Sequence, residues 1–171
     1  MLFRSLAVRG RDSRLITTPN ASTVRSLAVQ TRGDSEVLYY GEQGDFGFVE
    51  IDSSGAGLAR SLKHLVPDSI DFGDIWNAHV VNDQVFFQSR SFIFRLSSDE
   101  IAFWQSENGY HNTFQVEDRY FVREFGVGLK EFNGAGFVLV QGGEILKGDL
   151  VSGITKQSKD RKSTRLNSSH V

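Results

Sequence analysis

The sequence predicts an all-β fold. Apolar residues occur in short runs rich in Val, Ile, Phe and Tyr, and Gly, Asp, Asn and Ser separate these runs, as is typical of strands and turns. No sustained helical periodicity is present, and only residues 57–66 could form one or two helical turns. The runs also recur in groups of four about every 40 residues, a period typical of proteins built from repeated four-stranded sheets.

The predicted strands follow the chain in three complete groups. The first group comprises residues 23–29, 36–40, 48–52 and 58–65. The second comprises residues 75–80, 84–88, 92–96 and 100–104. The third comprises residues 110–116, 119–122, 129–132 and 136–140. A strand at 149–154 begins a fourth group, and residues 4–18, with a turn at 9–12, end a preceding one.

Repeated sheets of this kind bury their faces only against neighbouring sheets, as the blades of a β-propeller do. The sequence therefore predicts an incomplete β-propeller of about three four-stranded antiparallel blades, with Phe87 and Phe94 on opposite faces of the second. An immunoglobulin-like sandwich has strands at a similar spacing, but the four-strand repeat with similar first strands favours blades. The expected blades cover residues 22–66, 74–105 and 110–141, with partial blades at 1–20 and 147–159.

The end of the chain is expected not to be native. Residues 160–170 read DRKSTRLNSSH, which resembles the in-frame translation of a common sequencing-library adapter. We therefore assign residues 1–159 to the partial propeller and 160–171 to an adapter-derived tail that should not pack on the blades. The alternative is a solvated basic segment that touches nucleic acid.

Composition is that of a soluble globular chain, with 39% hydrophobic and 23% charged residues. The formal net charge of −2 argues against a nucleic-acid partner. The absence of cysteine excludes disulfides and thiolate metal sites. No apolar run approaches the length of a membrane-spanning helix, so no membrane segment is expected within this sequence.

Short motifs recur at corresponding places of the groups and resemble the repeats of bacterial two-component-regulator propellers. The resemblance covers about residues 14–154. Its motifs are 24–29 (VRSLAV), 41–47 (GEQGDFG), 71–76 (DFGDIW), 85–88 (VFFQ), 93–95 (IFR), 126–129 (GVGL) and 141–144 (QGGE).

In that family the propeller is the sensory input region of a membrane-bound signalling protein. A triple-tyrosine module, a membrane helix and an output domain such as a histidine kinase or cyclase follow it. The resemblance implies a periplasmic or otherwise extracytoplasmic region that binds a small molecule, a glycan or a protein, and that needs no cofactor. None of the following modules is present in this sequence, so the identity of the output domain is not implied.

Loop residues supply the first set of candidate ligand contacts. In an antiparallel four-stranded sheet, the loop between strands two and three lies at the same end as the connection to the next sheet. Charged and aromatic residues of these loops should gather there, where binding sites are common. The candidates are Asp45, Phe46, Asp71, Phe72, Asp74, Arg90 and His111.

The two Asp-Phe-Gly triplets at 45–47 and 71–73 have two other interpretations. Kinase chemistry would also require a His-Arg-Asp loop and a Val-Ala-Ile-Lys strand, which the sequence lacks. The simpler interpretation is a turn glycine beside a Phe that fills the gap between sheets.

Asn77 and His79 alternate on one predicted strand and are expected to line a central channel. The histidines lack the spacing of a metal site, and no nucleophile elbow is present, so we assign no metal ligand and no catalytic residue. The favoured function is therefore a non-catalytic sensory propeller. The alternative is a propeller hydrolase or lyase that uses His79 with an acidic residue in the channel.

Overall fold

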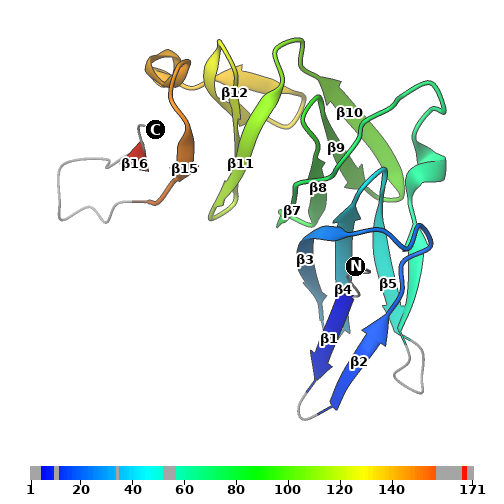
Figure 1. Cartoon of the computed structure of the whole chain (residues 1–171). Coiled ribbons are helices and arrows are strands. Elements are labelled where there is room, and N and C mark those ends of the chain that lie inside the picture. Colours follow the sequence, from blue (N-terminus) through cyan, green and yellow to red (C-terminus); the bar gives the residue numbers. More distant parts are fainter. Residues whose placement is uncertain (1–4, 10–11, 34, 52–56, 157–166, 169–171) are drawn as a thin grey trace.

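The computed structural model describes residues 5–9, 12–33, 35–51, 57–156 and 167–168 of the 171-residue chain. It is all-β and contains three four-stranded antiparallel sheets that follow one another along the chain in an arc (Figure 1). Within the described residues the helical content is limited to two short 3-10 turns, η1 (Lys63–Leu65) and η2 (Gly143–Leu146).

Each sheet is a simple meander in which consecutive strands are hydrogen-bonded neighbours. The first sheet contains β3 (Val24–Arg32), β4 (Ser35–Glu42), β5 (Asp45–Ile51) and β6 (Gly57–Ser61). The second contains β7 (Asn77–Val81), β8 (Gln84–Gln88), β9 (Phe92–Ser97) and β10 (Glu100–Gln105). The third contains β11 (Tyr110–Val116), β12 (Arg119–Glu124), β13 (Gly128–Phe132) and β14 (Phe137–Leu139).

Turn chemistry explains where the strands of the second sheet end. Asn82 and Asp83, which join β7 to β8, have φ of 49° and 60°. Ser98 and Asp99, which join β9 to β10, have φ of 48° and 66°. Two consecutive residues with positive φ form the tight hairpin turn whose twist matches that of the flanking strands. The predicted groups of four strands are thus confirmed. The run at 58–65 is a strand to Ser61, and η1 then forms one short helical turn within residues 57–66.

The sheets pack face to face and bury apolar residues between them. Phe87 and Phe94 of the second sheet lie in one cluster with Tyr39 and Phe46 of the first. The expectation that Phe87 and Phe94 face opposite ways is therefore wrong. They are directly paired across β8 and β9, and directly paired residues share a face.

Two further clusters continue this arrangement along the chain. On the opposite face of the second sheet, Phe86 stacks on Tyr120 of the third sheet, with ring centroids 4.1 Å apart. The far face of the third sheet packs Phe121 and Leu129 against Leu146 and Val151. The outer face of the first sheet packs Tyr40 and Val49 against Ile16, so apolar clusters lie on both faces of every sheet.

The first strands of successive sheets lie side by side. The strand β7 contacts both β3 and β11, and β11 contacts β15 (Val151–Gly153). No sheet closes on itself in the part of the chain that the structure describes.

Each end of the described chain carries a two-stranded sheet. The strands β1 (Ser5–Arg9) and β2 (Asp12–Ile16) pair antiparallel, and the center of their predicted turn lies outside the described residues. At the other end, β16 (Asn167–Ser168) pairs with β15. This pairing differs from the expectation that the tail stays off the sheets. The pairing has a physical reason, because an open strand edge offers unpaired backbone groups to any extended segment. Residues 160–166 of the predicted tail lie outside the described residues.

Candidate functional site

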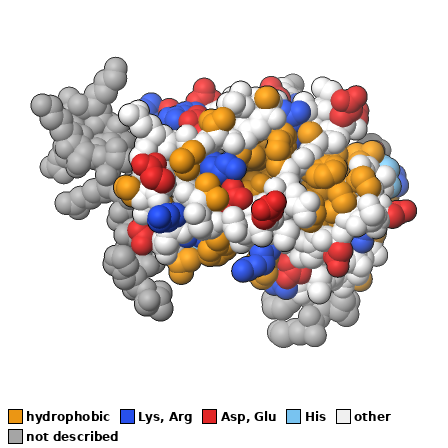
Figure 2. Space-filling view, turned by 90° about the horizontal axis from the view of Figure 1, so that it is seen from above, with side chains coloured by type: hydrophobic (Ala, Val, Ile, Leu, Met, Phe, Trp, Pro, Cys, Tyr) orange, Lys and Arg blue, Asp and Glu red, His pale blue; other side chains and the backbone are white. Residues whose placement is uncertain are grey.

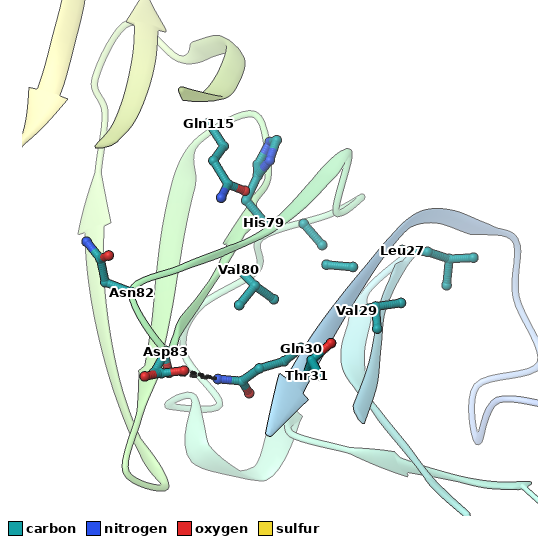
Figure 3. A pocket seen from close by; sticks show the side chains of 11 residues that line it. Leu27, Val29, Gln30, Thr31, His79, Val80, Asn82, Asp83 and Gln115 are labelled. Carbon is teal, nitrogen blue, oxygen red and sulfur yellow. Dashed lines mark hydrogen bonds between the residues drawn. The ribbon is translucent and has the colours of Figure 1, made fainter. Parts of the chain in front are cut away.

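An open groove of about 540 Å³ runs beside the first strands of the three sheets. Residues 27–31 of β3 and 78–80 of β7 form its sides. Figure 3 shows His79 and Gln115 near one another, while Gln30 and Asp83 meet elsewhere in the groove. Of the two residues that the sequence predicts to line a channel, Asn77 and His79, only His79 lines this groove.

His79 is the titratable group of this groove whose environment is most unusual. Its ring lies 5.7 Å from the Tyr120 ring, and its buried Nε2 atom has no hydrogen-bond partner. Burial lowers the pKa of His79, while a hydrogen bond to the backbone of Thr113 acts in the opposite direction. Burial therefore favours the neutral imidazole, while the unpartnered Nε2 is itself buried and not exposed to the groove.

Asn77 lies on the same strand but is already engaged. Its Nδ2 donates to Gln88 Oε1 at 2.6 Å and to Asn112 Oδ1 at 2.8 Å. Asn77 thus ties the second sheet to the third and does not line the groove.

Gln30, Asp83 and Gln115 also line the groove, although the sequence did not single them out. Gln30 Nε2 donates to the Asp83 backbone oxygen at 3.2 Å, and Tyr39 donates to Gln30 Oε1 at 3.0 Å. The available signal was the alternation of β3, which puts Gln30 on the buried side of its strand.

The predicted loop face forms as two separate junctions. Gly44 N donates to Gly73 O at 2.9 Å, and Ile75 N donates to Glu42 O at 3.0 Å. These bonds confirm that the turn after the second strand lies beside the connection to the next sheet.

The corresponding bonds recur further along the chain. Tyr110 N donates to Arg90 O at 2.6 Å, and Gly126 N donates to Lys147 O at 3.3 Å.

At the first junction, Asp45, Phe46 and Phe72 are not loop ligands. Asp45 is 4% exposed and Phe46 is fully buried, because they are the first two residues of β5 and do not lie in the turn that precedes it. The Phe46 ring lies 5.5 Å from Phe72 and 4.6 Å from Phe87. The Phe of each Asp-Phe-Gly triplet thus fills the gap between sheets, as the simpler interpretation expected. Its turn glycine is found at Gly73, whose φ is 65°, but not at Gly47, which lies inside β5.

Asp71 and Asp74 do lie at the surface of this junction. Asp71 Oδ1 accepts a hydrogen bond from Gly73 N at 3.3 Å. Asp74 pairs with Arg25 at 2.8 Å, and the Arg25 guanidinium lies 4.5 Å from the Trp76 ring centroid.

The second junction brings Arg90 and His111 together around Phe125. The Arg90 guanidinium lies 5.4 Å from the Phe125 ring centroid, and the His111 ring lies 5.6 Å from it. Arg123 stacks on the same ring at 4.4 Å. Burial and the Arg123 charge lower the pKa of His111. The candidates therefore separate into one groove and two junctions.

Replacing surface acids at the first junction should hardly change stability. We expect Asp71→Ala to alter the free energy of unfolding by less than about 0.5 kcal/mol. Asp74→Ala should lose up to about 1 kcal/mol, because its ion pair is partly exposed. Chemical denaturation of both variants measures this. A loss above about 2 kcal/mol for Asp71→Ala would mean that its turn supports the junction.

Charges of both signs are mixed over the face drawn in Figure 2, so this face shows no large basic patch. The described residues contain no group of three or more His, Asp and Glu that could hold a metal ion. Within the same residues, no helix has the length and hydropathy to cross a bilayer. The chain matches no protein-family model, and none of the curated proteins matches it.

Proposed function

We propose that this chain is part of a β-propeller that acts as a non-catalytic sensory region, and that its ligand binds in the groove beside the first strands. The observation that carries the proposal is the repeated arrangement of sheets. Three meanders pack face to face, and their first strands lie next to one another, with β7 between β3 and β11. Propeller blades surround a channel with this arrangement.

The hydrogen-bonded junctions support the same proposal. A repeat architecture predicts that each connection meets the preceding turn in the same way, and the bonds Gly44–Gly73 and Gly126–Lys147 are equivalent in this sense.

The groove supports a binding role because polar groups line most of it and a few apolar side chains lie beside them. Leu27, Val29 and Val80 supply apolar contact, while Gln115 supplies hydrogen-bonding groups that could fix the orientation of a ligand. A small molecule, a glycan or a protein segment could enter it.

The resemblance to two-component-regulator propellers supports the wider assignment. The whole protein would then place this region outside the cytoplasm and signal through a histidine kinase or cyclase domain. The gene sequence on both sides of this chain tests the assignment. A membrane helix followed by such an output domain is expected, whereas a propeller that closes and stops would favour an enzyme.

His79→Gln should weaken ligand binding without unfolding the chain. A lost ring contact of about 1.4 kcal/mol corresponds to a tenfold weaker affinity. A thermal-shift screen with small molecules and oligosaccharides would identify a ligand, and calorimetry would compare the variants. His64→Gln is the matched control, because His64 is exposed at η1 outside the groove. Equal affinities for both variants would remove the groove from consideration.

A further inference from the structure

The last residue of the second strand occupies a corresponding buried position in all three sheets. These residues are Glu42 in β4, Gln88 in β8 and Glu124 in β12. Glu42 and Gln88 are 0% and 1% exposed, and Glu124 is 7% exposed. A buried side chain at this position is therefore a feature of the repeat, but its charge differs from sheet to sheet.

The third sheet neutralises its glutamate. Lys130 Nζ lies 2.9 Å from Glu124 Oε2, and Ser106 Oγ donates to Glu124 Oε1 at 2.5 Å. The second sheet has an uncharged amide, Gln88, at this position. Neither sheet leaves an uncompensated charge there.

The first sheet instead sets a second carboxyl group against the glutamate. Glu42 is paired directly with Asp45 across the β4–β5 hairpin, so both side chains share one face of the sheet. Glu42 Oε2 accepts a hydrogen bond from Thr18 Oγ1 at 2.6 Å, whereas its Oε1 atom is buried without a partner. The hydroxyl of Tyr40, two residues earlier on the same face, is likewise buried without a partner.

Asp45 is only partly compensated. Its Oδ1 atom accepts hydrogen bonds from Ser61 Oγ at 2.6 Å and from the Phe46 amide at 2.8 Å. The cation that acts on Asp45 is Lys63, whose side chain is exposed on η1 and lies over the Phe72 ring. No ion pair joins it to either carboxyl group among the described residues.

We infer that Glu42 and Asp45 share one proton and that this proton makes the first junction sensitive to pH. Two buried carboxylates side by side cannot both ionise without a large desolvation and repulsion penalty. One proton removes the repulsion and converts a carboxylate oxygen into a donor. In the first sheet the proton thus compensates the buried charge, as the Lys130 ammonium group does in the third sheet.

The pKa values of both carboxyl groups are raised, as this geometry requires. Burial raises the pKa of Glu42 above its ordinary 4.5 and the charge of Asp45 also raises it, while hydrogen bonds from Thr18 and from the Ser22 backbone oppose the rise. Burial likewise raises the pKa of Asp45 above its ordinary 3.8, which hydrogen bonds from Ser61 and the Phe46 amide and the charge of Lys63 oppose. The folded chain therefore binds a proton more tightly than the unfolded chain. Stability from this pair is present at low pH and is lost as pH rises through the folded pKa.

The shared proton would act where three segments meet. The connection after β2 reaches the hairpin through Thr18, and Asn20 Nδ2 donates to Gln43 O at 2.6 Å. On the other side, Ile75 N donates to the Glu42 backbone oxygen. Deprotonation places two negative charges in the middle of these contacts. It should therefore loosen the hairpin tip from both connections.

Glu42→Gln tests the proton directly, because it installs the amide that the second sheet already uses. Its NH₂ group can donate to Asp45 as the shared proton does. We expect the variant to melt several degrees above the unmodified chain at about pH 8. This difference should narrow as the pH falls and approach zero only near the ordinary Glu pKa of 4.5, where the unfolded chain also binds the proton. Since the comparison is between two chains with the same histidines, the lowered pKa values of His79 and His111 cancel.

Glu124→Gln is the matched control. It removes the partner of Lys130, so its midpoint should lie below that of the unmodified chain at about pH 8. A second readout is the infrared carbonyl band of a protonated carboxyl group at neutral pH, which should disappear in Glu42→Gln.

Two results would overturn the inference. One is a Glu42→Gln chain that melts at or below the unmodified chain at about pH 8. The other is a difference in melting midpoint that disappears when Ca²⁺ is added and returns when a chelator removes it. A metal ion would then occupy the place assigned to the proton.

Discussion

Phe46→Ala is expected to destabilise the chain by about 3–5 kcal/mol. The Phe46 side chain is 0% exposed and lies between two sheets. Its ring centroid lies within 5.5 Å of three other rings, those of Phe72, Phe87 and Phe94. Truncation therefore removes the transfer free energy of a whole aromatic side chain. It also leaves a cavity between two sheets, which cannot fill it without shifting relative to one another.

Thermal unfolding followed by near-ultraviolet circular dichroism measures this loss. For a chain of this length, the expected fall in midpoint is roughly 6–20 °C. Phe103→Ala is the control, since Phe103 is 40% exposed at the outer strand β10. It should lose only about 1 kcal/mol. If Phe46→Ala does not fold, Phe46→Leu keeps most of the volume and should still lose more than Phe103→Ala.

The same residue shows what sequence reasoning could and could not reach. The strand pattern was predictable because each strand carries its own apolar runs and each hairpin its own turn residues, such as Asn82 and Asp83. The burial of Phe46 depends on Phe87 and Phe94, which reach it only through packing of the second sheet on the first. A local pattern holds no information on that contact, so a residue next to a turn looked exposed.

The environment of the carboxyl groups at the first junction was not predictable from the sequence, for a related reason. Asp45 resembles a solvated turn residue in the sequence, yet Ser61 and the Phe46 amide bind its carboxylate inside the sheet. Glu42 gave no sequence signal at all. Its unusual position emerges only when the strand ends of three sheets are compared with one another.

The groove was predictable in part. The alternation of β7 correctly put Asn77 and His79 on one face, but register alone could not say that Asn77 would bind Gln88 and Asn112 while His79 lines the groove. Hydrogen-bond partners from different sheets decide which of two equivalent strand positions remains available.

Gly128→Ala is the second substitution with a large expected effect, and we expect a loss of about 3–5 kcal/mol. Gly128 begins β13 with a φ of 125°, a conformation that side-chain-bearing residues rarely adopt. A Cβ atom there would lie 2.3 Å from the Gly143 backbone oxygen, which belongs to η2. Backbone cannot rotate away as a side chain can, so η2 would have to leave the third sheet.

Gly134→Ala separates the two causes. Gly134 also has a positive φ, 97°, but a Cβ atom there would meet nothing within 4 Å. This control should therefore lose only the conformational part, about 1–2 kcal/mol. Denaturant unfolding gives both values, and hydrogen exchange at the Lys147 amide, which donates to Glu144 O in η2, reports on the local detachment. If both variants lose the same amount, strain alone accounts for Gly128, and the close approach of η2 to β13 contributes nothing to the stability of the third sheet.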